Sequence, residues 1–258
     1  MLEIRDLSAT YEDTESVKHV SLSVQPGEIV GIVGESGSGK STMLKAVLNL
    51  FHQKKVVLNG EILFHGENLL KKKPAEMRQL RGSRIAMVFQ HPELSMDPLW
   101  TIGQTFYESI RVHRKITHAE SDAAAKQLLT SLHFEHPDKI LASYPFELSG
   151  GMCQRVAIAI AAANGPELIL ADEPTSALDV TVQLQAIETM MEMRDTFGMA
   201  ILIVSHNMGV IAKMADKVGV MRQGELVEWG TKDEVLYHPQ HEYTKALIEA
   251  VPRIRSEK

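Results

Sequence analysis

The nine residues 34–42 carry the most specific chemistry in the chain. They read Gly34-Glu35-Ser36-Gly37-Ser38-Gly39-Lys40-Ser41-Thr42 and fit the pattern G-x-x-x-x-G-K-[ST]. The glycines let successive backbone amides surround an anion, and a helix start adds its positive dipole end. We therefore expect this loop to bind a nucleoside triphosphate. Lys40 would reach the β- and γ-phosphates, and the Ser41 hydroxyl would hold Mg²⁺.

A pair of carboxylates, Asp172 and Glu173, follows the apolar run of residues 168–171. Asp172 suits a carboxylate that holds Mg²⁺ through its water shell. Glu173 can instead serve as the general base for an attacking water. The alternative for such a pair is a helix cap or a surface pair, and the phosphate loop in the same chain favours the catalytic interpretation.

Two further polar side chains, Gln90 and His206, also follow apolar runs, over residues 84–89 and 200–205. Tyr11 is expected on an exposed loop, where its ring either stacks on a base or is an ordinary surface side chain. The histidines between residues 113 and 136 have spacings that put no convincing metal-ligand set on one face, so we expect surface histidines.

The elements that position these residues alternate between strands and helices. We expect strands over residues 2–7, 20–24, 28–33, 56–68, 84–90, 167–173 and 200–206, with turns at Asn59-Gly60 and His65-Gly66. Helices are expected over 101–111, 119–132, 151–163 and 180–197. This alternation predicts a parallel sheet covered on both faces. Ligands of such sheets bind beyond the carboxyl ends of the strands, so Gly34, Gln90, Asp172 and His206 should face one crevice.

Composition limits the protein class. The chain has 258 residues, 44% of them hydrophobic, a net charge of −6 and a single cysteine. This predicts a globular chain without an internal disulfide, and the charge argues against a surface that coats nucleic acid. We expect no signal peptide at Met1, and the apolar run at 156–163 is too short to span a bilayer.

Taken together, these motifs resemble those of the nucleotide-binding subunits of ABC transporters over nearly the whole chain. In that resemblance Gln90 is the Q-loop glutamine, His206 the switch histidine and Tyr11 the adenine-stacking aromatic. The family's signature corresponds to Leu148-Ser149-Gly150-Gly151-Met152, and its D-loop to Ser176-Ala177-Leu178-Asp179.

The resemblance implies an α/β fold, with a P-loop NTPase core of a mainly parallel sheet and flanking helices, an N-terminal antiparallel β subdomain and an inserted α-helical subdomain. The single ABC ATPase domain, residues 1–258, would comprise a nucleotide-binding core with the β subdomain (1–92 and 166–235), a helical signature subdomain (93–165) and a C-terminal extension (236–258). ATP and Mg²⁺ are the implied cofactors. Mg²⁺ would be held with ATP by Ser41, Gln90 and Asp172, and the implied catalytic residues are Lys40, Gln90, Glu173 and His206.

The resemblance also implies a head-to-tail dimer, in which each signature caps the γ-phosphate held by the other subunit and Asp179 links the two sites. The signature helix start, with Ser149 and two glycines, is suited to bind that anion.

Three segments narrow the resemblance to the peptide and nickel importers: Met152-Cys153-Gln154-Arg155, residues 92–99 and residues 238–247. In the segment of residues 238–247, the alternative interpretation of His238 and His241 is a purely structural one, as parts of a turn and a helix start. The implied function is ATP-driven import of peptides or of nickel or metal chelates. The implied partners are two membrane permeases, a paralogous ATPase subunit or a second copy, and an extracytoplasmic substrate-binding protein, but no nucleic acid. The chain would lie peripherally on the cytoplasmic face of the cell membrane.

Two classes of protein other than importer subunits also use such a phosphate loop. A soluble ABC-type ATPase acting on nucleic acid or ribosomes usually carries a long coiled-coil insertion or two ATPase units, and the sequence shows neither. A GTPase or small-molecule kinase would share the phosphate loop, but the chain has no Asn-Lys-x-Asp pattern for guanine and the signature would have no role.

Overall fold

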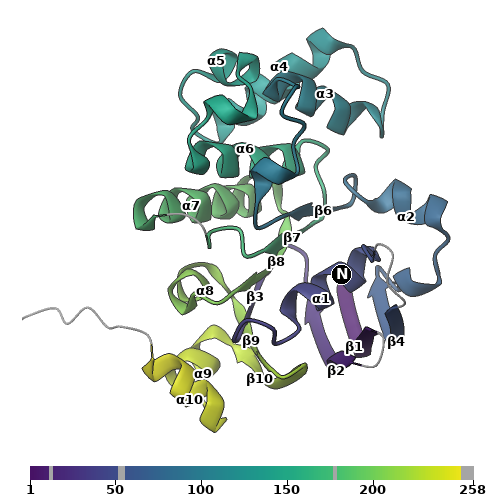
Figure 1. Ribbon diagram of the computed structural model, residues 1–258, viewed down its shortest axis with the longest axis vertical. Coiled ribbons are helices and arrows are strands. Elements are labelled where there is room, and N and C mark those ends of the chain that lie inside the picture. The colour runs from purple at the N-terminus through teal and green to yellow at the C-terminus, as the bar shows by residue number, and fades with distance from the viewer. Residues whose placement is uncertain (12–13, 52–55, 177–178, 251–258) are drawn as a thin grey trace, which may run out of the picture. The chain divides into compact units, whose positions relative to one another are not determined.

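The computed structural model describes residues 1–11, 14–51, 56–176 and 179–250, and the chain divides into two compact units (Figure 1). Unit 1 holds residues 1–24, 29–70 and the chain from 204 onward, and unit 2 holds residues 25–28 and 71–203. None of the helices in the described ranges has both the length and the apolar character needed to cross a membrane.

Unit 1 contains a four-stranded antiparallel sheet with the order β2-β1-β4-β5, of which Figure 1 labels β2, β1 and β4. Its strands are β1 (Leu2–Tyr11), β2 (Thr14–Val24), β4 (Val56–Phe64) and β5 (Glu67–Asn68). The prediction of two short strands with Tyr11 on a loop is wrong. Tyr11 is the last residue of β1, where it pairs with Thr14 and Val56. The two strands are longer than expected because cross-strand pairing continues beyond the apolar core of each.

The predicted turn at Asn59-Gly60 is also wrong, because β4 continues through both residues. Gly60 has φ +93°, and a Cβ there would lie 2.3 Å from the backbone oxygen of Asp6. The register of β1 against β4 shifts at this point, and Asp6 itself has φ +50°. The glycine therefore marks a close approach at a β-bulge. The turn at His65-Gly66 is confirmed, since β4 and β5 pair on either side of it.

The rest of unit 1 includes strand β3 (Ile29–Val33), whose five residues are all buried. β3 pairs in parallel with β9 (Lys217–Arg222), which pairs antiparallel with β10 (Glu225–Thr231). The helices of the unit are α1 (Lys40–Leu48), α8 (Met208–Met214), α9 (Lys232–Tyr237) and α10 (Glu242–Glu249). The short 3₁₀ turn η1 (Leu69–Lys71) begins in this unit and ends in unit 2. Helix α8 packs closely on β3, because a Cβ on Gly31 would lie 2.6 Å from the side chain of Ile211.

Unit 2 combines a parallel strand pair with a group of helices. Strands β6 (Ile85–Val88) and β7 (Leu168–Asp172) pair in parallel, with Val88 opposite Ala171. Strand β8 (Ala200–Ser205) begins in this unit and ends in unit 1. The helical elements are α2 (Pro74–Leu80), η2 (Pro92–Leu94), α3 (Ile102–Arg111), α4 (His118–Ser131), α5 (Pro137–Ala142), η3 (Pro145–Glu147), α6 (Gly150–Ala162) and α7 (Val180–Phe197).

The four predicted long helices of unit 2 are confirmed, each to within one residue at either end. Each begins after a residue whose side-chain oxygen accepts a hydrogen bond from the first helical turn: Thr101, Thr117, Ser149 and Asp179. Such caps satisfy backbone amides that have no partner within the helix. The starts of these four helices are therefore fixed by residues that are adjacent in sequence.

Candidate functional site

The phosphate loop lies in unit 1, between β3 and α1, and it is closed around the side chain of Lys40. Lys40 is only 4% exposed. Its Nζ donates to the backbone oxygens of Gly34 and Glu35, both at 2.8 Å, and to the Ser38 hydroxyl at 3.2 Å. A buried ammonium needs such partners. The loop thus holds one positive charge at a fixed place beside the start of α1.

Two of the loop glycines are required by packing against other strands. A Cβ on Gly34 would lie 2.1 Å from the backbone oxygen of Met221, and one on Gly39 would lie 2.3 Å from that of Ser16. Gly37 also has a positive φ, +80°, which favours glycine. Unlike Gly34 and Gly39, it is not closely packed, because an added Cβ would meet nothing within 4 Å. The outer part of the loop at Gly37 is therefore open to a ligand.

The start of α1 is suited to an anion. Its first turn, which holds Lys40, Ser41 and Thr42, contains no acidic side chain. Negative charge is stabilised at such a helix start. Tyr11 lies near this turn: burial raises the pKa of its hydroxyl, while a hydrogen bond with the Thr42 side chain acts to lower that pKa. The Tyr11 ring packs edge-on against Phe51, with ring centres 5.6 Å apart.

His206 follows the last residue of β8 and is exposed. The next residue, Asn207, caps α8, and its Oδ1 accepts from the backbone amide of Gly209 at 2.9 Å. The amide of Asn207 in turn donates to the Ser205 hydroxyl at 3.0 Å. The backbone on either side of His206 is thus fixed by the strand end and the helix start.

In unit 2, parallel pairing of β6 and β7 places the side chains after both strands at one edge. Gln90 Nε2 lies 3.0 Å from the Ser176 hydroxyl and 3.5 Å from Glu173 Oε2. The backbone oxygen of Glu173 accepts from both the amide and the hydroxyl of Ser176, each at 3.2 Å. Asp172, the last residue of β7, is buried. The predicted glutamine and general base therefore lie together.

Glu173 has an unusual backbone conformation, with φ +45°. A non-glycine residue in this region costs energy, and such residues occur often at functional sites. The two hydrogen bonds from Ser176 hold the turn in place.

The signature residues lie at the start of α6. Ser149 is exposed, and its hydroxyl accepts from the amide of Met152 at 3.3 Å. The two glycines have different roles, since a Cβ on Gly150 would meet nothing within 4 Å but one on Gly151 would lie 1.9 Å from Val182 Cγ1. Gly151 is thus needed for close packing of α6 on α7, whereas Gly150 leaves the helix start accessible. Leu148 directly precedes the capping serine and is half-buried.

Two of the four D-loop residues, Ala177 and Leu178, lie outside the described residues. Ser176 contacts Gln90, as above. Asp179 caps α7, with Oδ1 accepting from the amides of Thr181 at 3.0 Å and Val182 at 3.1 Å. Its proposed role in linking two sites stays a prediction.

The structure thus groups the predicted site residues within each unit. Unit 1 holds the phosphate loop, Tyr11 and His206; unit 2 holds Gln90, the two carboxylates, the signature and the described D-loop residues. The prediction that residues from both units share one crevice stays a prediction.

Sequence reasoning missed the residues that support the phosphate loop from a distance. Besides Ser16 and Met221, the amide of Gly224 donates to the backbone oxygen of Ser38 at 3.1 Å. The hydroxyl of Tyr243 accepts from the amide of Glu35 at 3.2 Å. Only the segment around Tyr243 had a sequence signal, as part of the tail at residues 238–247, and it indicated no contact with the loop.

Comparison with protein families gives two matches. The family described as ABC transporter matches residues 17–176, which is more than half of the chain. A second family, described as the oligopeptide/dipeptide transporter C-terminal region, matches residues 227–258. The second match includes the tail that contacts the phosphate loop.

Several curated proteins are similar over almost the whole chain. The peptidoglycan transport ATP-binding protein YejF of Agrobacterium fabrum is 43% identical over 98% of this chain, which spans 47% of that protein. The probable peptide ABC transporter ATP-binding protein y4tR of Sinorhizobium fredii is 40% identical over 98% of this chain, which spans 77% of it. The dipeptide transport ATP-binding protein DppD of Lactococcus lactis is 39% identical over 99% of this chain, which spans 75% of that protein. The chain thus spans about half the length of some relatives and about three quarters of others.

Among solved structures, a dimeric post-hydrolysis state of the ATP-binding cassette MJ0796 bound to ADP and Pi has a TM-score of 0.78 and 28% identity. The alignment covers 90% of this chain and 99% of that one. CbiO1 from Clostridium perfringens, part of the ABC transporter complex cbiONQ, also has a TM-score of 0.78, with 25% identity. The fold predicted from sequence is therefore confirmed.

Proposed function

Because the chain belongs to the ABC transporter ATPase family and carries the oligopeptide/dipeptide transporter C-terminal region, we propose that it is the ATP-hydrolysing subunit of a peptide importer. The observation that carries this proposal is the phosphate loop, which encloses Lys40 with Gly34 and Glu35 and is open at Gly37. A loop of this kind presents backbone amides and one fixed cation to a triphosphate.

The residues present fit ATP with Mg²⁺. The hydroxyl of Ser41, the amide oxygen of Gln90 and the carboxylate of Asp172 are oxygen donors, the type that Mg²⁺ prefers. Mg²⁺ bound with ATP would neutralise charge on the phosphates. Glu173 would accept the proton of the attacking water. His206 would hold the γ-phosphate, and Tyr11 would stack on adenine.

We further propose that two such subunits act as a head-to-tail dimer. The accessible start of α6, at Ser149 and Gly150, suits the γ-phosphate bound by the other subunit. Leu148, Gly151 and Met152 would support that contact, and Asp179 would link the two sites. The second subunit is a paralogue or another copy of this chain.

The cargo and the remaining partners follow from the relatives. Relatives named as peptide, dipeptide, oligopeptide and glutathione import proteins favour peptides over nickel or metal chelates. The subunit would bind two permeases at the cytoplasmic face of the membrane, in a system that includes an extracytoplasmic substrate-binding protein. A soluble ABC-type ATPase acting on nucleic acid is disfavoured by the net charge of −6.

Binding of ATP·Mg²⁺ to Lys40→Ala tests the core of the proposal. Hydrogen bonds to a charged group are worth about 1.5–3 kcal/mol, so loss of the ammonium should weaken binding at least about tenfold. Lys45→Ala, in the same helix, is the matched control and should bind like the parent. Calorimetric titration with ATP and with GTP measures both affinity and base preference. An unchanged affinity in Lys40→Ala would contradict the assignment.

Copurification with the membrane partners tests the transport role. The subunit should copurify with two permeases, and cargo with its binding protein should stimulate ATP hydrolysis by the complex. Hydrolysis that responds to RNA or ribosomes instead would favour the alternative function.

A further inference from the structure

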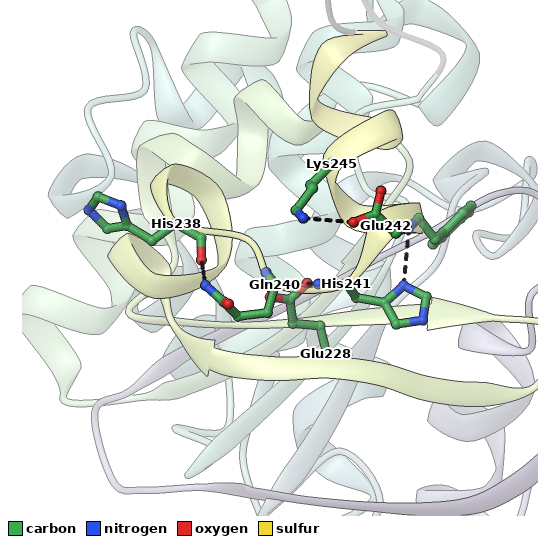
Figure 2. Close-up of polar contacts among 7 residues, drawn as sticks. Glu228, His238, Gln240, His241, Glu242 and Lys245 are labelled. Carbon is green, nitrogen blue, oxygen red and sulfur yellow. Dashed lines mark hydrogen bonds and ion pairs between the residues drawn. The ribbon is translucent and has the colours of Figure 1, made fainter.

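The C-terminal segment of unit 1 is anchored to β10 by one carboxylate. Glu228 Oε1 accepts from the amide of Gln240 at 2.7 Å, and its Oε2 accepts from the amide of His241 at 3.3 Å (Figure 2). His241 Nδ1 then accepts from the amide of Tyr243 at 3.1 Å and so caps α10. These bonds fix where α10 starts and which way its first turn faces.

The first turn of α10 carries Tyr243, which reaches the phosphate loop. Its hydroxyl accepts from the backbone amide of Glu35 at 3.2 Å, a contact between residues 208 positions apart. The guanidinium of Arg222, at the end of β9, lies 4.8 Å from the centre of the Tyr243 ring. Burial raises the pKa of Tyr243, although the hydrogen bond from the Glu35 amide acts to lower that pKa. The side chain is therefore a neutral phenol fixed at both its ring and its hydroxyl.

Glu35 connects this tyrosine to the lysine of the loop. Its amide donates to Tyr243, while its carbonyl oxygen accepts from Lys40 Nζ at 2.8 Å. The two contacts hold opposite ends of the same residue. A change at Tyr243 can therefore move the carbonyl that helps to place the Lys40 ammonium.

We propose that Tyr243 is a positioning residue, through which the C-terminal segment of residues 232–249 holds the phosphate loop in the conformation that binds ATP. The inference rests on the proposed function, because it assigns this segment a part in nucleotide affinity. By linkage, bound ATP would in turn strengthen docking of the segment. Without the hydroxyl, a smaller fraction of molecules has the loop in its binding conformation. The apparent affinity for ATP falls in proportion to that fraction.

Tyr243→Phe tests this with the removal of a single oxygen, since the ring over which Arg222 lies is kept. Loss of the contacts that the hydroxyl makes with Glu35, at a partly exposed site, should weaken ATP·Mg²⁺ binding about threefold to tenfold. KM for ATP should rise with little change in kcat. Tyr237→Phe is the matched control: Tyr237 ends α9 and is 66% exposed, so the same chemical change should leave affinity and KM as in the parent.

Hydrogen exchange in the absence of nucleotide provides a second measurement. The amide of Glu35 should exchange faster in Tyr243→Phe than in the parent, while the amides of β3 stay protected. Glu228→Ala removes the carboxylate that anchors the segment. It should also speed exchange at the Glu35 amide and weaken ATP binding. This second variant keeps the test available if Tyr243→Phe folds poorly.

The outcomes separate the two proposals. If the parent fails to bind ATP, the proposed function falls. If the parent binds ATP but Tyr243→Phe and Glu228→Ala match it in affinity and in exchange at Glu35, only the positioning role is overturned. Weaker binding in both variants, with faster exchange at Glu35, would support it.

Discussion

Replacing Gly39 with alanine should destabilise the protein more than the same change at Gly37, two residues earlier in the loop. Both glycines have positive φ, +99° and +80°, so either substitution incurs the cost of a left-handed alanine, roughly 1–2 kcal/mol. Only at Gly39 does the new methyl group also meet a backbone atom, the oxygen of Ser16 at 2.3 Å.

That contact cannot be relieved by a side-chain rotation, because the Ser16 oxygen belongs to strand β2. Overpacking of this kind costs about 1–3 kcal/mol. We therefore expect a loss of about 2–5 kcal/mol in the free energy of unfolding for Gly39→Ala, against about 1–2 kcal/mol for Gly37→Ala.

Thermal unfolding without nucleotide measures the difference. In a chain of this size each kcal/mol shifts Tm by about 2–4 °C, so Gly39→Ala should melt about 2–12 °C below Gly37→Ala. Nucleotide is left out because a methyl group at Gly37 lies on the open part of the loop, where it could change nucleotide binding as well as stability. Equal melting temperatures for the two variants would show that the Gly39–Ser16 approach does not constrain the loop.

Two substitutions in unit 2 test the assigned chemistry. Glu173→Gln keeps the shape and the hydrogen-bond acceptor facing Gln90 but removes the base, so single-turnover hydrolysis should fall about 10²–10⁴-fold while ATP binding is retained; turnover at the parental rate would refute the base assignment. Ser149→Arg should abolish hydrolysis in the partner's site but spare nucleotide binding in its own subunit. This can be measured in mixed dimers with Ser149→Ala as the control for the lost helix cap, worth about 1 kcal/mol. Hydrolysis at the parental rate in the partner's site of dimers with Ser149→Arg would exclude the signature contact.

Much of the site could be predicted from sequence because it depends on neighbours in the chain. The phosphate loop is contiguous, and the start of α6 at Ser149 and of α7 at Asp179 follows from caps within three residues. The apolar runs before Gln90 and Asp172 indicate buried strands, and each of these polar residues lies within two residues of its strand end. Such features require no knowledge of which strands pair.

Other features depended on which segments of the chain approach one another. Asn59-Gly60 has the residues of a turn, but Asp6 lies against Gly60 and the strand continues. The tail of residues 238–247 reads as a turn and a helix start, and His241 does cap α10; its contact with Glu35 through Tyr243 joins residues 208 positions apart. Periodicity and capping describe interactions along a few neighbouring residues. Strand register and close packing are decided by the opposing surface, which only the tertiary structure supplies.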